Sequence, residues 1–161
     1  MFRCSFVDTT LKAVAVVLLA GSVATGVAAL NAEGGQSVNR NKEGLAIDGY
    51  DPVAYFVDGA AVPGRTDLTV VVNGTTYRFS TAANRDRFQQ DPSQFLPQYG
   101  GFCAYAVSRG YTANIDPQAW KVVDGKLYLN YSKRVQRTWQ EDIPGNIRKA
   151  DANWPGLRDK E

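Results

Sequence analysis

The sequence predicts an α+β fold: one small domain with two β-hairpins and several short helices. Two dipeptides, Asn73–Gly74 and Asp124–Gly125, separate runs of β-branched and other apolar residues. A two-residue turn of this kind between apolar runs is the strongest local signal of a hairpin. We therefore expect hairpins at about residues 68–79 and 120–131. Helix caps and prolines between them indicate that the helices are short.

The first half of the domain should contain two helices, one on either side of the first hairpin. Asp51 is a favourable N-cap and Pro52 suits the first helical position, which predicts a helical turn over residues 53–57. After the hairpin, the Ser80–Thr81 pair offers a cap for a helix across residues 82–90. Capping side chains thus mark where both helices begin.

The second half of the domain begins with a run of apolar and small residues. This run, residues 102–107, is predicted to form a short buried helix. A buried strand is the alternative, because periodicity cannot separate the two over so few residues. After the second hairpin we expect two more helices, residues 133 to about 142 behind the cap Ser132, and residues 144–154, which Pro155–Gly156 should end.

The N-terminal part of the chain has the pattern of a secretory signal peptide. A mildly basic start precedes an uncharged stretch over residues 13–30, and Val27–Ala29 offers small residues at the cleavage position. An uncleaved anchor is the alternative, because about 18 apolar residues can just span a bilayer. N-terminal sequencing of the secreted protein decides between the two. We expect cleavage. The chain then divides into a signal peptide (residues 1–29), a flexible linker (30–43), the domain (44–157) and a C-terminal tail (158–161).

The composition excludes several kinds of chemistry. The 161 residues carry a formal net charge of +2 and include two cysteines, one methionine and no histidine. Without histidine there is no Ser-His or Cys-His pair and no imidazole ligand for a metal. No basic stripe is visible, so nucleic acid is not an expected partner. Cys4 lies in the predicted signal peptide, which leaves Cys103 as the single thiol of the mature protein.

Several motifs together resemble the longer, exported YHS-domain proteins of bacteria. Two of them are Gly49–Phe56 (GYDPVAYF) and Tyr99–Val107 (YGGFCAYAV). Further matches are Tyr77–Ser80, Asn84–Phe88, Asp91–Phe95 and Asp124–Ser132. The resemblance extends over almost the whole predicted domain. It implies the fold of this family and a periplasmic or secreted location in bacteria, but no defined activity.

Shorter YHS domains resemble metal-binding modules, and this sequence departs from them. They carry a cysteine just after their Asp-Pro-Val and a cysteine pair after the aromatic residue that closes the first hairpin. Here Ala54 follows Asp51–Val53, and residues 80–83 contain no cysteine. The resemblance therefore implies a shared scaffold, and the metal role of the shorter relatives does not transfer by position.

Cys103 and nearby aromatic residues are the candidate binding residues. A free cysteine is often a buried small hydrophobe, but Gly100–Gly101 before it would let a ligand approach the backbone. Most of the tyrosines are expected to be core and rim residues that bury a ring and hydrogen-bond the hydroxyl, and the alternative is that some line a ligand pocket with Cys103. Asp51 is expected mainly as a helix cap. We select as ligand-binding candidates Cys103, Tyr50, Asp51, Tyr99, Tyr105 and Tyr131, and we select no catalytic residue.

Three functions remain open on the sequence alone. The first is a non-enzymatic binding module for a small molecule, or for a metal ion held partly by Cys103. Copper is the metal considered, since Cu(I) favours thiolates, and a homodimer would bring two copies of Cys103 together. The second is a thiol-dependent enzyme or redox protein that uses Cys103. The third is a structural interaction domain in which Cys103 is buried.

Overall fold

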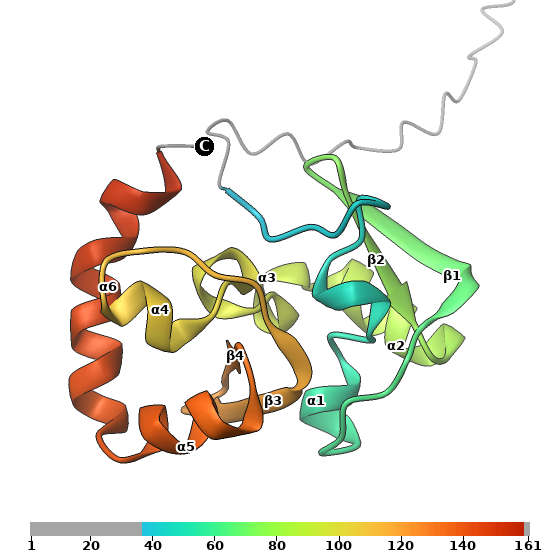
Figure 1. Ribbon diagram of the computed structural model, residues 1–161. Coiled ribbons are helices and arrows are strands. Elements are labelled where there is room, and N and C mark those ends of the chain that lie inside the picture. Colours follow the sequence, from blue (N-terminus) through green and yellow to red (C-terminus); the bar gives the residue numbers. More distant parts are fainter. Residues whose placement is uncertain (1–36, 160–161) are drawn as a thin grey trace, which may run out of the picture.

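The computed structural model describes residues 37–159 and has the predicted α+β architecture. Two separate antiparallel sheets, each a two-stranded hairpin, are surrounded by short helices and one longer C-terminal helix (Figure 1). No helix within residues 37–159 is both long and apolar enough to cross a membrane. The predicted signal peptide lies outside the described residues.

The first hairpin organises one half of the domain. Strands β1 (Arg65–Val72) and β2 (Thr75–Phe79) pair with Val72 opposite Thr75, which places the turn at the predicted dipeptide. Strand β1 starts three residues earlier than predicted, beyond a break in the register. The helices of this half are the 3-10 helix η1 (Ile47–Gly49) and the α-helices α1 (Ala54–Val57), α2 (Ala82–Gln90) and α3 (Pro92–Phe95).

The second hairpin organises the other half. It consists of β3 (Asp116–Val123) and β4 (Lys126–Asn130), joined at the second predicted turn. The apolar run at residues 102–107 forms a helix and not a strand. The helices of this half are η2 (Gln98–Gly101), α4 (Ala104–Ser108), α5 (Lys133–Gln140) and α6 (Ile143–Arg158).

Side-chain caps mark the beginning of two helices, as predicted. The Thr81 hydroxyl accepts the backbone N–H of Asn84 at 3.1 Å, so Thr81 caps α2. The Ser132 hydroxyl accepts the backbone N–H of Val135 at 3.3 Å and caps α5. Each cap satisfies a backbone donor that has no partner within its helix.

The predicted ends of the last two helices were wrong. Helix α6 continues through Pro155 to Arg158, although we expected it to stop at Trp154. Trp154 and Leu157 pack against a hydrophobic core, and this burial holds the last turn in place despite the proline. Helix α5 ends at Gln140, because the next turn contains Asp142, the cap of α6.

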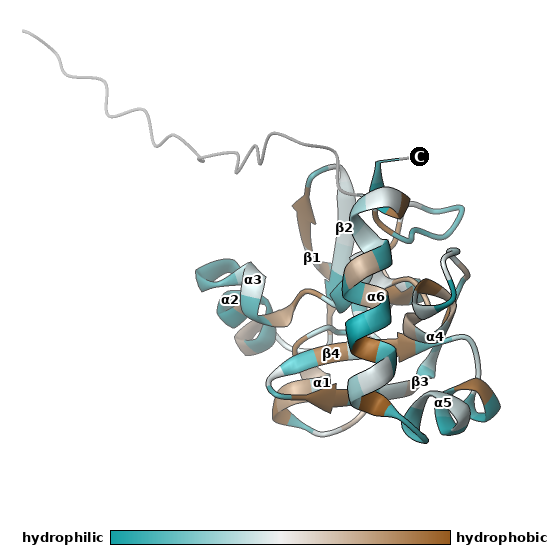
Figure 2. Cartoon of the chain, turned by 90° about the vertical axis from the view of Figure 1, so that its left-hand side faces the viewer, coloured by the Kyte–Doolittle hydropathy of each residue, from teal (hydrophilic) through white to brown (hydrophobic). Residues whose placement is uncertain are grey.

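Strand β4 belongs to two hydrophobic cores and so unites the halves. Leu127 and Leu129 are buried in the first core with Phe79 and Phe88, whereas Tyr128 is buried in the second core with the aromatic side chains of the other half. This division follows from the alternation of side chains along a strand. Figure 2 shows teal, pale and brown stretches alternating along α6, as expected for a helix with one buried and one exposed face.

A segment before the first helix connects both halves across the top of the molecule in Figure 1. The Asn39 amide donates to the Gly100 carbonyl at 2.9 Å, and the Asn39 side chain donates to the Gly101 carbonyl at 3.2 Å. The Ala46 amide donates to the Thr76 carbonyl at 3.0 Å. These contacts join the segment to η2 in one half and to β2 in the other.

Candidate functional site

Cys103 lies at the start of α4, where it is the N-cap residue. Its side chain is buried, with only 1% of its surface exposed. The sulfur accepts a hydrogen bond from the Tyr131 backbone N–H at 3.3 Å, and the thiol donates to Asn130 Oδ1 at 3.9 Å. Cys103 is therefore held between the first turn of α4 and the end of β4.

Burial raises the pKa of the Cys103 thiol above its ordinary value. Backbone N–H groups of Ala106, Tyr131 and Tyr105 act in the opposite direction, but burial is the larger effect. An uncharged thiol therefore dominates at neutral pH, since even an ordinary thiol is mostly protonated there. Because the thiolate is the nucleophile and the metal ligand, this environment does not activate Cys103 for either role.

A pocket of about 290 Å³ lies beside Cys103, and we call it the Cys103 pocket. Three tyrosines line it together with the cysteine: Tyr105, Tyr111 and Tyr131. The remaining lining is aliphatic and consists of Ala106, Ala113 and Val135. The wall is thus mainly apolar, with phenol groups as its polar elements, which is the usual composition of a small-molecule site.

Two rings of the Cys103 pocket are exposed to solvent. Tyr111 is 54% exposed and Tyr131 is 61% exposed, whereas Tyr105 is half-buried. Sequence analysis selected Tyr105 and Tyr131, but it missed Tyr111. The available signal was the position of Tyr111 directly after Gly110, where the chain turns back at the end of α4 and the Tyr111 amide bonds the Ala106 carbonyl at 3.2 Å.

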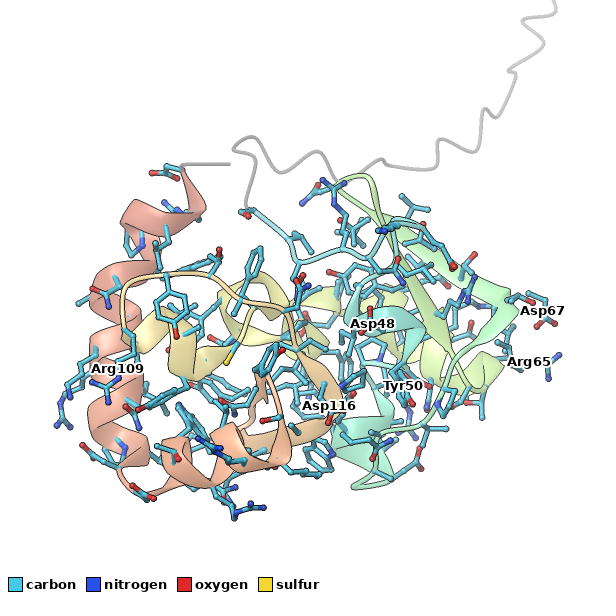
Figure 3. The ribbon with its side chains drawn as sticks, in the orientation of Figure 1. Asp48, Tyr50, Arg65, Asp67, Arg109 and Asp116 are labelled. Carbon is cyan, nitrogen blue, oxygen red and sulfur yellow. The ribbon has the colours of Figure 1, made fainter. Side chains whose placement is uncertain are left out.

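Tyr50 and Tyr99, two other predicted binding residues, lie outside the Cys103 pocket. The Tyr99 hydroxyl donates to Asp151 Oδ1 at 2.9 Å, and its ring packs against Trp154 with 6.0 Å between centroids. Tyr50 is half-buried against the first core. In Figure 3 Tyr50 lies right of the centre of the molecule, whereas Arg109, which follows α4, lies at the left edge.

Asp51, the remaining predicted binding residue, is completely buried in the first half of the domain. Its Oδ1 accepts the backbone N–H groups of Val53 at 2.8 Å and Ala54 at 3.3 Å. Its Oδ2 accepts the Ser80 amide at 2.8 Å, the Ser80 hydroxyl at 2.6 Å and the Asn84 side-chain amide at 2.8 Å. Asp51 therefore connects the start of α1, the end of β2 and the first turn of α2.

Comparison with known protein families gives a match to one segment of the chain. Residues 53–99 match the family model of the YHS domain. Over this segment the chain is similar to YHS domains. The match begins just before α1 and ends within η2, so it includes the first hairpin and stops before Cys103. No curated protein and no solved structure matches the chain.

The residues of the matched segment do not fit a metal ion. Within the part of the chain that the structure describes, no group of three or more His, Cys, Asp and Glu side chains could hold one. Ala54 is buried and apolar, and Ser80 and Asn84 direct their donors to Asp51. The burial of Cys103 also gives no support to a copper ion shared by two chains, which stays a prediction.

The Cys103 environment predicts slow thiol chemistry. In a Cys4→Ser background, we expect a maleimide to modify the native protein at neutral pH more slowly than the urea-unfolded chain, because burial limits access to the sulfur and raises the thiol pKa. The rate in the native protein should rise with pH beyond the range where an ordinary thiol is fully ionised. Equal rates in native and unfolded protein would show that Cys103 is accessible and ordinary.

Proposed function

We propose that the protein is a non-enzymatic binding module that holds a small, largely apolar molecule in the Cys103 pocket. The observation that carries this proposal is the meeting of three tyrosines and an uncharged thiol around a cavity of about 290 Å³. Exposed aromatic rings on a soluble domain commonly mark a binding surface. The proposal extends beyond the YHS domain itself, because the pocket is built by residues that follow the matched segment.

The state of Cys103 favours binding over catalysis. A thiol enzyme needs a thiolate, which is usually provided by an adjacent base or by a lowered pKa. The sequence has no histidine, and burial raises the thiol pKa of Cys103. The sulfur is therefore best described as a polarisable, apolar part of the pocket wall, which contributes contact area to a bound aromatic molecule.

Indole is a suitable probe, since it is flat, neutral and small enough for such a cavity. We expect a ¹H–¹⁵N NMR titration of the full chain with indole to shift the amide signals of α4, the 111–115 loop and Tyr131. Tyr131→Ala should weaken binding by about two- to tenfold, which corresponds to the 0.5–1.5 kcal/mol of an aromatic pair. Ala113→Leu should weaken binding as well, because the larger side chain enters the pocket.

Val71→Ala provides the matched control for this titration. Val71 is an exposed apolar side chain on β1, outside the Cys103 pocket, and its removal should leave the indole affinity unchanged. If indole causes no signal changes, or if Tyr131→Ala and Ala113→Leu both bind as the unaltered chain does, the pocket is not a binding site.

A further inference from the structure

The segments that build the Cys103 pocket carry positive charge without compensating acids. Residues 103–115 and 129–140 contain no aspartate or glutamate. They contain four cations, all on exposed side chains: Arg109, Lys133, Arg134 and Arg137. The ion pairs found within residues 37–159 involve other arginines, at positions 65, 85 and 158. These two pocket-forming segments therefore carry net positive charge, and the next acids along the chain are Asp116, Glu141 and Asp142.

Arg109 is the cation most closely tied to the pocket wall. Its Nη2 donates to the Tyr105 hydroxyl at 2.8 Å, and its guanidinium carbon lies 4.9 Å from the centroid of the Tyr105 ring. The two residues are four apart around the end of α4, so the local backbone geometry brings them together. Figure 3 shows the Arg109 side chain at the outer edge of the molecule.

A guanidinium held in this way is well suited to receive a carboxylate. It has five N–H donors, and the bond to Tyr105 uses one of them. The interaction with the Tyr105 ring limits the motion of the Arg109 side chain, so less conformational entropy is lost when an anion binds. The apolar interior of the pocket, by contrast, would penalise a buried charge. An anionic group is thus favoured at the edge and disfavoured inside.

We infer that the ligand of the Cys103 pocket is a small aromatic carboxylate, whose ring lies among the tyrosines and whose charge lies at the Arg109 edge. This inference rests on the proposed binding function and names the ligand class of that same site. The aromatic ring supplies apolar contact with Tyr105, Tyr111 and Tyr131, and the carboxylate supplies charge complementarity to Arg109. Charge complementarity of this kind contributes mainly to specificity and association rate.

Two isosteric probes test the ligand class: indole-3-carboxylate and indole-3-carboxamide. We expect the full chain to bind the carboxylate about three- to tenfold more tightly than the carboxamide in low salt, as for a partly exposed charge-assisted hydrogen bond. We define the preference as the dissociation constant of the carboxamide divided by that of the carboxylate. In Arg109→Gln this ratio should fall toward one, and in Arg109→Lys it should lie between the values for Arg109→Gln and the unaltered chain. The ratio should also fall as salt is added, because the interacting groups are exposed.

This ratio tests the ligand class separately from the proposed binding function. Arg87→Gln is the matched control, since it removes an exposed arginine on α2, outside the pocket, and should leave the ratio unchanged. If both probes bind equally, or if Arg109→Gln keeps the full preference, the carboxylate inference is wrong and the binding function stands. If neither probe binds, the proposed binding function and the ligand class both fail.

Discussion

Asp51→Ala is expected to lower the free energy of unfolding by about 3–5 kcal/mol, because it removes a buried carboxylate and leaves several buried donors unpaired. The carboxylate of Asp51 accepts five hydrogen bonds while completely buried. Its removal leaves two backbone N–H groups of α1, the Ser80 donors and the Asn84 amide without their partner. Urea unfolding followed by circular dichroism measures the loss.

Two further variants make the Asp51 result specific. Asp51→Asn keeps acceptor capacity on one atom but places an NH₂ group against donors. Its free energy of unfolding should therefore lie between those of Asp51→Ala and the unaltered chain. Asp58→Ala removes an exposed carboxylate just after α1 and should change stability by no more than about 0.5 kcal/mol. If Asp51→Ala were as stable as Asp58→Ala, the network would not contribute to the stability of the fold.

Gly100→Ala is expected to be the second severe change, with a loss of about 2–4 kcal/mol or a failure to fold. Gly100 has φ +60°, which an L residue adopts at a cost, and a Cβ added there would overlap the Ser37 carbonyl oxygen. The backbone around Gly100 also accepts the Asn39 amide at 2.9 Å. An added methyl group would therefore separate the N-terminal segment from η2.

Gly59→Ala is the control that isolates this contact. Gly59 has the same φ of +60°, but a Cβ there would meet no atom within 4 Å. Gly59→Ala should therefore lower the free energy of unfolding only by the cost of the left-handed conformation, about 1 kcal/mol. Equal losses in both variants would show that the left-handed conformation alone matters at Gly100. A melting curve and an NMR spectrum of each variant distinguish local separation of the segment from global unfolding.

The position of the pocket relative to the YHS domain affects how function is assigned. The matched segment, residues 53–99, contains the first hairpin and the groups that donate hydrogen bonds to Asp51, which lies just before it. These features stabilise the scaffold and show no set of metal ligands. The Cys103 pocket is formed by the residues that follow, so a function transferred from the matched segment alone would overlook it.

Much of the fold is predictable because its signals are local. The turn dipeptides Asn73–Gly74 and Asp124–Gly125 locate both hairpins, since each adopts the left-handed conformations that such turns require. The caps Thr81 and Ser132 locate helix starts for a similarly local reason, the need to satisfy free backbone donors. The end of α6 was mispredicted because packing of Trp154 outweighs the local effect of Pro155.

The candidate site could be predicted only in part. Cys103, Tyr105 and Tyr131 were selected from the sequence, and the structure brings these three together at one pocket. Tyr111 joins them because the turn at Gly110 returns the loop to α4, and the Cys103 amide donates to the Ala113 carbonyl at 3.0 Å. Tyr50, Asp51 and Tyr99 were selected by the same reasoning, yet their side chains lie in other parts of the molecule.

The sequence by itself determined the α+β class, the two hairpins, the absence of imidazole chemistry and the resemblance to YHS-domain proteins. Turn preferences, capping and composition act over a few residues, so they can be read without long-range contacts. Only the tertiary structure decided that Cys103 is a buried thiol at the wall of a tyrosine-lined pocket. Its burial and its pKa depend on side chains of β4, α5 and the 111–115 loop, whose approach follows from packing of both cores.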